Sequence, residues 1–338
     1  MKKRVRIGLV VFLVLCVVWA VSLVLVPQST LFHGKPASEW IKGITYFGDD
    51  AQVKQWRAFG PEGLHLLARA LDKGRLYRKA YRWLMPRLPD SINSFLYPRL
   101  PKPADSRSTR VCVLSLLSQL GTDAKPVEPA IARALNDDDN GVRLSALGCY
   151  EQLLSVMSEK EKVARLPAFL LTLRDQDEWI RNNAAVALWH YSGHGPQVVP
   201  ALVQRLQDSN LDVRLQAAKA LAHIDVQAAT RAGVVPIAIQ ILKEPNDQVA
   251  YQAAQLLGEM GKEPDLAVPA LIASVHGTNG LVASWAARSL GNFPSQANII
   301  VPVLLKALHD TNGIISRWGP ADALKAIDDA AAVKAGIK

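Results

Sequence analysis

A fixed distance between a proline and a β-branched residue recurs six times in the carboxyl-terminal two thirds of this 338-residue chain. The two members of each pair are thirteen residues apart, whereas successive prolines are 33 to 38 residues apart. Constant spacing within units and variable spacing between them is typical of stacked repeats whose loops vary on one face. The pairs are Pro129 and Val142, Pro167 and Ile180, Pro200 and Val213, Pro236 and Val249, Pro269 and Val282, and Pro302 and Ile315.

Each unit predicts two helices. We expect the proline to open the first, helix A, because the N–H that proline lacks would have no partner in a first helical turn. The β-branched residue, called the marker below, begins the second, helix B. Alanines four and five residues after the marker would let neighbouring helices approach closely, and a leucine eight residues after it would fill the space between layers. These positions hold Ala184, Ala185 and Leu188; Ala217, Ala218 and Leu221; Ala253, Ala254 and Leu257; and Ala286, Ala287 and Leu290.

An acidic residue closes helix A in four units, and an arginine follows the marker in three. With the proline and the alanine–leucine pattern, these residues resemble the HEAT-repeat (armadillo-type) family, in the short form of exported or membrane-anchored bacterial proteins. The resemblance covers residues 121–338 and implies an all-α fold, a right-handed α-α superhelix. The last three units lack the arginine, so an aspartate–arginine ladder should be partial. The residues are Asp137, Asp175, Asp208 and Asp310, with Arg143, Arg181 and Arg214.

The amino terminus has the pattern of a membrane anchor. Residues 7–26 carry no ionisable side chain except the thiol of Cys16, and four cations precede them. Twenty helical residues span about 30 Å, the thickness of the bilayer hydrocarbon. Residues 1–26 therefore predict one transmembrane helix in the inner membrane, with the rest of the chain exported. Cleavage as a signal peptide, or lipidation at Cys16, remains a possible alternative.

Residues 27–120 predict a linker and a degenerate helical repeat, followed by six HEAT-like repeats over 121–338. Residues 59–71 resemble a helix A, and residues 110–120 resemble a helix B. Five prolines lie within 86–106, which we expect to be a loop because proline interrupts long helices. Terminal repeats are often atypical because they cap an exposed core.

The sequence contains no recognisable catalytic motif. Three cysteines are too few for a cysteine-based metal centre, and the seven histidines include no His-Glu-x-x-His motif. His190 and His194 are four residues apart, but no third ligand is near them in sequence. No phosphate-binding glycine loop or nucleophile elbow occurs. We therefore expect neither an enzyme nor a bound cofactor or metal.

Basic residues concentrate in residues 54–110, which contain 13 Lys and Arg but only 4 Asp and Glu. Between residues 75 and 87, aromatic side chains alternate with cations. This composition suits contact with an anionic surface. The alternatives are a solvated face of a half-buried helix, contact with anionic lipid or an acidic partner, and nucleic acid, the least expected of the three. The candidate contact residues are Arg75, Arg78, Lys79 and Arg82.

Positions 3, 6 and 10 after each marker share one face of helix B, and most hold polar residues. In HEAT-like arrays this solvent side lines the concave groove. Two successive units place tryptophans there, and exposed tryptophan beside arginine is typical of binding hot spots. In the alternative interpretation, Trp318 caps the last repeat and Trp285 packs beneath it. The candidate partner-binding residues are Trp285, Trp318, Arg288, Lys325, His190 and His223.

These observations predict a non-catalytic scaffold that binds a protein partner through the concave helix-B face. The sequence does not identify that partner. The alternative is a HEAT-like polyanion-binding or enzymatic protein that uses the basic segment 75–87 to contact nucleic acid or anionic lipid.

Overall fold

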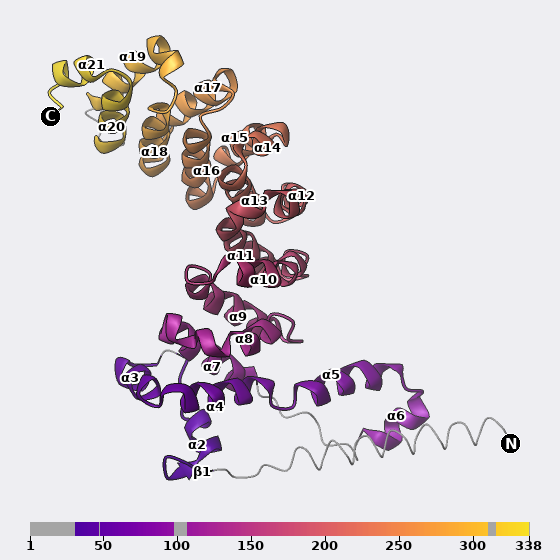
Figure 1. The fold of residues 1–338 in the computed structure, drawn as a ribbon. Helices are drawn as coiled ribbons and strands as arrows, with labels where there is room; N and C mark the ends of the chain where they lie inside the picture. The colour runs from indigo at the N-terminus through magenta and orange to yellow at the C-terminus, as the bar shows by residue number, and fades with distance from the viewer. Residues whose placement is uncertain (1–30, 47, 98–106, 310–315, 338) are drawn as a thin grey trace. The chain divides into compact units, whose positions relative to one another are not determined.

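The computed structural model describes residues 31–46, 48–97, 107–309 and 316–337. The chain divides into two compact units, residues 1–161 and 162–338, and the division falls inside helix α10 (Glu159–Thr172). Both units are built from packed helices, as Figure 1 shows. The described residues contain one sheet, formed by two strands of two residues each.

A short hairpin and an aromatic cluster open the amino-terminal unit. His33 and Gly34 both have positive φ, as a tight hairpin turn between β1 and β2 requires. The indole N–H of Trp40 donates to the carbonyl of Phe32 (2.8 Å), and the Phe32 and Trp40 rings each lie 5.0 Å from the ring of Phe59. These contacts join the hairpin to the first helices. The elements are β1 (Leu31–Phe32), β2 (Lys35–Pro36), α2 (Ala37–Lys42), α3 (Asp50–Ala58) and α4 (Gly60–Asp72).

The predicted degenerate repeat has both of its helices. Helix α4 has Pro61 in its first turn, as expected for a helix A, and packs against α7, whose bounds Arg107–Leu120 match the predicted helix B. Part of the segment predicted as a loop is helical, because Asp90–Leu96 form α6. The other elements are α5 (Arg75–Leu84), η1 (Met85–Arg87), η2 (Gly121–Val127), α8 (Glu128–Ala134) and α9 (Asn140–Leu153).

Two helical layers form the carboxyl-terminal unit. The B helices contact one another in chain order, and the A helices pack against them on the other side (Figure 1). The B layer contains α11 (Glu178–Leu188), α13 (Leu211–Ile224), α16 (Asp247–Met260), α18 (Gly280–Leu290) and α20 (Trp318–Ile327). The A side contains α12 (Gly195–Arg205), α14 (Val226–Arg231), α15 (Val234–Leu242), α17 (Pro264–Val275) and α19 (Ala297–Leu308), with η3 (Trp189–His194), η4 (Pro294–Gln296) and α21 (Asp329–Lys334) completing the unit.

The predicted core positions of helix B are confirmed. The markers Ile180, Val213 and Val249 are buried, and the twelve alanines and leucines predicted to lie between layers each have 0% exposure. Burying small side chains at these positions allows neighbouring helices to approach closely. The spacing read from the sequence therefore identified the packing surface of the B layer.

Pro129 lies in the first turn of α8, as predicted, but in four other units the position of the proline differs from the prediction. Pro167, Pro200, Pro269 and Pro302 lie inside α10, α12, α17 and α19 instead of opening them. Helices α12 and α17 begin earlier because Pro196 and Pro264 occupy their first turns. Each interior proline lacks the N–H that would bond to the carbonyl four residues before it. The repeat unit was correctly located, but the first turns of helix A were missed.

Very close packing joins the last three B helices. A Cβ added at Gly258 would lie 2.7 Å from the Cβ of Ser289, and one added at Gly291 would lie 2.9 Å from the Cα of Ala323. A Cβ at Gly319 would overlap the carbonyl oxygen of Ser284. Only glycine permits this approach, and it sets how near equivalent side chains on successive helices can be.

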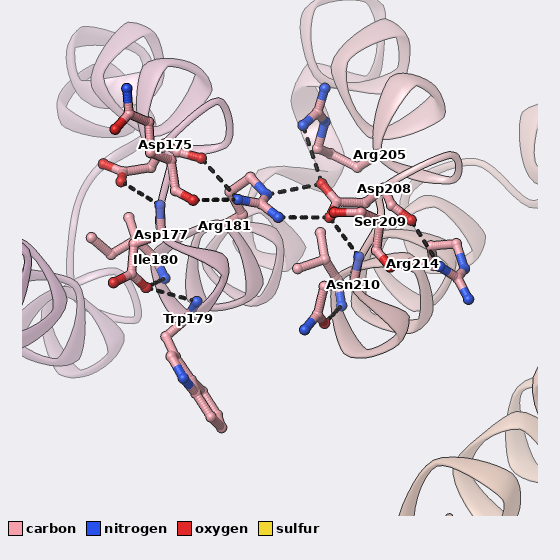
Figure 2. Close-up of polar contacts among 12 residues, drawn as sticks. Asp175, Asp177, Trp179, Ile180, Arg181, Arg205, Asp208, Ser209, Asn210 and Arg214 are labelled. Atoms are coloured by element: carbon pink, nitrogen blue, oxygen red, sulfur yellow. Dashed lines mark hydrogen bonds and ion pairs between the residues drawn. The ribbon is translucent and has the colours of Figure 1, made fainter. Parts of the chain in front are cut away.

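The aspartate–arginine ladder is present and partial, as predicted. Arg181 donates to both carboxylate oxygens of Asp208 in the next repeat (2.8 and 2.9 Å). It also donates to the carbonyl of Asp175 in its own repeat (3.0 Å), as Figure 2 shows. Arg214 donates to the carbonyl of Asp208 in the same way (2.8 Å). The amino-terminal unit adds a comparable contact, because Arg110 donates to the Asp137 carboxylate (3.1 Å).

The prediction of a transmembrane helix, and with it a single pass through the inner membrane, is corrected. Among the helices within residues 31–46, 48–97, 107–309 and 316–337, none is long and apolar enough to cross a membrane. The longest of these described helices have 14 residues, about 21 Å at 1.5 Å per residue, against about 30 Å of hydrocarbon. The segment 7–26 that suggested the anchor lies outside the described residues.

Candidate partner-binding surface on the B layer

One face of the B layer is open to solvent from α11 to α20. Its residues lie 3, 6 and 10 positions after the markers, and none of them is buried. The exposure predicted for these positions is therefore confirmed. The helix-B face consists of Asn183, Val186 and His190; Gln216, Lys219 and His223; Gln252, Gln255 and Glu259; Trp285, Arg288 and Asn292; and Trp318, Ala321 and Lys325.

Trp285, Arg288 and Trp318 come together at the carboxyl-terminal end of this face. The two indole rings lie 5.2 Å apart between centroids, edge to face at 76°. The guanidinium carbon of Arg288 lies 5.4 Å from the Trp285 ring centroid and 5.7 Å from that of Trp318. Tyr251 on α16 extends the group by stacking 5.9 Å from Trp285. We call these four residues the tryptophan–arginine cluster.

The cluster is accessible, although its rings also pack against each other. Trp318 is 38% exposed, Trp285 is half-buried, and Arg288 is exposed. Trp318 begins α20, so it is helical and does not lie in the preceding turn. The backbone N–H of Ser316 donates to the Ser284 hydroxyl (3.0 Å), which helps to fix this end of α20 against α18. Trp318 is therefore both partly exposed and packed against Trp285, and its contact with a partner stays a prediction.

Polar side chains linked across helices occupy the middle of the face. Gln216 and Lys219 on α13 both donate to the side-chain oxygen of Gln252 on α16, at 3.4 and 3.2 Å. Burial lowers the pKa of Lys219. These contacts link the side chains of α13 and α16 in this part of the face.

The two histidines predicted at this face have different surroundings. His223 is exposed and stacks on Trp189, with centroids 3.9 Å apart and planes 12° apart. His190 lies in η3, after α11 has ended at Leu188. His194 also lies in η3, so the four-residue spacing does not place these two rings on one α-helix. Within the described residues, no three His, Cys, Asp or Glu side chains are grouped as a metal site would require.

An open cavity of about 760 Å³ adjoins His223. Residues of η3, α12, α13 and α14 line it, including the charged pair Asp225 and Arg231. Asp225 is the N-cap of α14 and accepts from the backbone N–H of Ala228, so its carboxylate already has a structural role. Of the residues of the helix-B face, His223 takes part in this lining.

The four predicted cations of the basic segment do not form one surface. Arg78 is buried, donates to the carbonyl of Lys73 (2.6 Å) and pairs with Asp137 (3.7 Å). Arg82 pairs with Asp138 (2.9 Å). Burial and the neighbouring Arg110 cation lower the pKa of Arg78, although Asp137 opposes this shift. Two of the four cations, Arg78 and Arg82, are therefore engaged in ion pairs. Of the other two, Lys79 is exposed and Arg75 is partly exposed.

Two features of the B layer were not identified from the sequence. Trp179 is 63% exposed and lies one turn before Asn183, at the amino-terminal edge of the helix-B face. The second feature is the row of N-caps three residues before the markers, where Asp or Asn accepts a backbone N–H in five helices. Comparing the residue at this position in successive repeats would have identified these caps. They are Asp139, Asp177, Asn210, Asn246 and Asn279.

Comparison with protein families matches residues 166–232 and 235–325 to the model for HEAT repeats. Among solved structures, an engineered protein is similar with a TM-score of 0.51 and 21% identity, covering 89% of this chain and 87% of the engineered one. The X-ray structure of YibA of Escherichia coli is similar with a TM-score of 0.52 and 18% identity, covering 83% and 97%. At these identities the likeness concerns the fold alone. No curated protein sequence matches this chain.

Proposed function

Because this chain belongs to the HEAT-repeat family, we propose that it is a non-catalytic scaffold that binds a protein partner through its helix-B face. Repeats of this kind stack into extended surfaces that are commonly used for binding. Fold alone does not determine function, so the proposal depends on the residues of the face itself.

The observation that carries the proposal is the grouping of aromatic side chains with an arginine on an exposed, regular surface. Tryptophan, tyrosine and arginine are the residues enriched at the centres of protein interfaces. Here Trp285, Trp318, Tyr251 and Arg288 lie within contact of one another on three successive helices. The close helix packing at Gly319 and Ser284 fixes their positions, which limits the conformational freedom lost on binding.

The test is comparative affinity purification of the full chain from its native cells, with quantitative mass spectrometry. Trp285→Ala/Trp318→Ala removes the aromatic surface from the B layer. Leu266→Ala/Ile299→Ala is the matched control, because these side chains are 51% and 49% exposed on α17 and α19 of the A side. We expect a partner recovered by the wild type and the control to fall at least tenfold with the tryptophan variant.

Equal recovery by all three proteins would contradict the helix-B face as the partner site. Thermal unfolding followed by circular dichroism shows whether each variant remains folded at the purification temperature. Should the double variant unfold, Trp318→Ala alone replaces it, since the 38% exposure of Trp318 makes its loss less damaging than that of Trp285.

A further inference from the structure

The guanidinium of Arg288 is held in place by aromatic rings. Its carbon lies over the faces of both Trp285 and Trp318, at 5.4 and 5.7 Å from the centroids. Contact with two indole faces restricts the rotation of the long side chain. A guanidinium fixed in this way loses less conformational freedom when it binds a ligand.

The polar side of this guanidinium is only loosely occupied. Its contact with Asp322 is an ion pair of 3.6 Å between Nε and Oδ2, longer than a hydrogen bond, and both side chains are about half exposed. Exposed pairs of this kind contribute little free energy and are easily exchanged. In the part of the chain that the structure describes, the guanidinium of Arg288 makes no hydrogen bond to another residue. Its terminal nitrogens can therefore donate to a ligand.

A planar pair of guanidinium N–H groups matches a carboxylate, which can accept two parallel hydrogen bonds. A phosphate would also fit these donors, but its second negative charge would be repelled by Asp322. The arrangement therefore favours a singly charged carboxylate over a dianionic group.

The rings on either side define what should accompany the carboxylate. Trp318 presents an exposed apolar surface, and Tyr251 stacked on Trp285 continues that surface toward α16. Packed helices are about 8–10 Å apart, and an extended peptide advances about 3.3 Å per residue. An apolar side chain about three positions from the carboxylate would therefore reach the neighbouring helix.

We propose that the tryptophan–arginine cluster binds an extended acidic segment of the partner protein. In that segment an aspartate or glutamate pairs with Arg288 and displaces Asp322, and an apolar residue within three positions packs on the indole rings. This assignment rests on the proposed function and adds the chemistry of the bound segment.

The test is selection of random twelve-residue peptides displayed on phage against the immobilised full-length chain. We expect the selected peptides to be enriched in an acidic residue with an apolar residue within three positions. Synthetic copies should bind Arg288→Gln at least tenfold more weakly than the wild type. Arg231→Gln is the control, because this exposed arginine of α14 lies away from the cluster. The Arg231→Gln chain should bind the peptides as tightly as the wild type does.

A second variant separates recognition from a structural role. Asp322→Asn removes the carboxylate that competes for Arg288, so it should tighten binding of the acidic peptides about two- to fivefold. Arg288→Lys keeps the charge but lacks the planar pair of donors, and should weaken binding while leaving the helix folded. Changing the acidic residue of a peptide to its amide should weaken binding to the wild-type chain. The factor should equal the one by which Arg288→Gln weakens binding of the original peptide.

Two outcomes overturn different statements. Selected peptides without acidic enrichment, or bound equally by Arg288→Gln, would contradict the acidic segment while leaving the helix-B face as a protein-binding surface. Peptides whose binding is unaffected by Trp285→Ala/Trp318→Ala, or no selection above the bare matrix, would contradict the proposed function itself.

Discussion

Arg181 joins two repeats with a single side chain. Its guanidinium donates to both oxygens of Asp208 in the following unit and to the carbonyls of Asp175 and Gln176 after its own helix A (Figure 2). Arg181 is 9% exposed and Asp208 8%. The arginine therefore both pairs a buried charge and satisfies two carbonyls of the loop between α10 and α11.

Replacing Arg181 by methionine should destabilise the protein strongly, because it leaves the Asp208 carboxylate buried without its main partner. Removing one member of a buried pair costs about 3–5 kcal/mol. The control is Arg205→Met, which loses a more exposed contact to the same carboxylate (3.2 Å) and should cost about 1 kcal/mol or less. Urea unfolding followed by circular dichroism measures both. Equal unfolding midpoints for the two variants would contradict the role given to Arg181.

The same ion pair predicts a dependence on pH. Burial alone would raise the pKa of Asp208, but hydrogen bonds from Arg181 and the Asn210 backbone N–H, with nearby cations, outweigh it and lower the pKa. A lowered pKa in the folded state stabilises the protein above the ordinary aspartate pKa, and this stabilisation is lost as pH falls through the lowered value. The stability difference between wild type and Asp208→Asn should be constant from pH 7 to about 5 and shrink below about pH 4. Urea midpoints at several pH values test this, and a difference that grows on acidification would contradict it.

The residue pattern of the ladder could be read from the sequence because each member occupies a fixed place in its unit. The ring contacts of Trp285 and Arg288 could not be read in the same way. They depend on the distance between α18 and α20, which the contact of Gly319 with Ser284 sets. Periodicity gives the face on which a side chain lies, but not its distance from the equivalent side chain of the next unit.

Helix B was located more accurately than helix A, for a physical reason. An Asp or Asn cap precedes each marker by three residues in α9, α11, α13, α16 and α18, so these helices begin at a fixed position. Helix A has no such constant start. Unit four even divides it into α14 and α15, because Gly233 has a φ of +76° that no α-helix interior can contain.

Gly319→Ala tests the close contact between α18 and α20. The added methyl group would overlap the Ser284 carbonyl oxygen, so the end of α20 must shift, at a cost of about 1–3 kcal/mol. Trp318 should then move away from Trp285, which a change in tryptophan fluorescence would report. In contrast, Gly148→Ala in α9 meets no atom within 4 Å and should be neutral or stabilising by up to about 1 kcal/mol. Thermal unfolding compares the two variants with the wild type. A Gly319→Ala protein as stable as the wild type would contradict the close packing of α18 and α20.

At the scale of the whole molecule, the repeat period together with the proline, alanine–leucine and aspartate–arginine positions was sufficient to predict an all-helical HEAT-repeat architecture. The predicted membrane placement relied on the apolar content of residues 7–26. It is corrected because no described helix can cross a bilayer. The ion pairs of the basic segment could not be read from its composition. Counting cations could not show that Arg78 would be buried against Asp137 or that Arg82 would pair with Asp138.

The helix-B face was predictable as a surface but not as a binding site. Its fifteen positions follow from the helical period, and all are at least partly exposed. Which part of it can bind depends on how side chains of successive helices meet. Gln216 and Lys219 both donate to Gln252, whereas Arg288 keeps donors available beside exposed rings.

Photocrosslinking in the native cells tests the helix-B face most directly. The photoreactive residue p-benzoylphenylalanine is introduced in place of Trp318 on the B layer or of Ile299 on the A side, in otherwise unchanged full-length protein. The account predicts a discrete crosslink to a second protein from position 318 and none from position 299. Crosslinks of equal yield from both positions, or from position 299 alone, would contradict it.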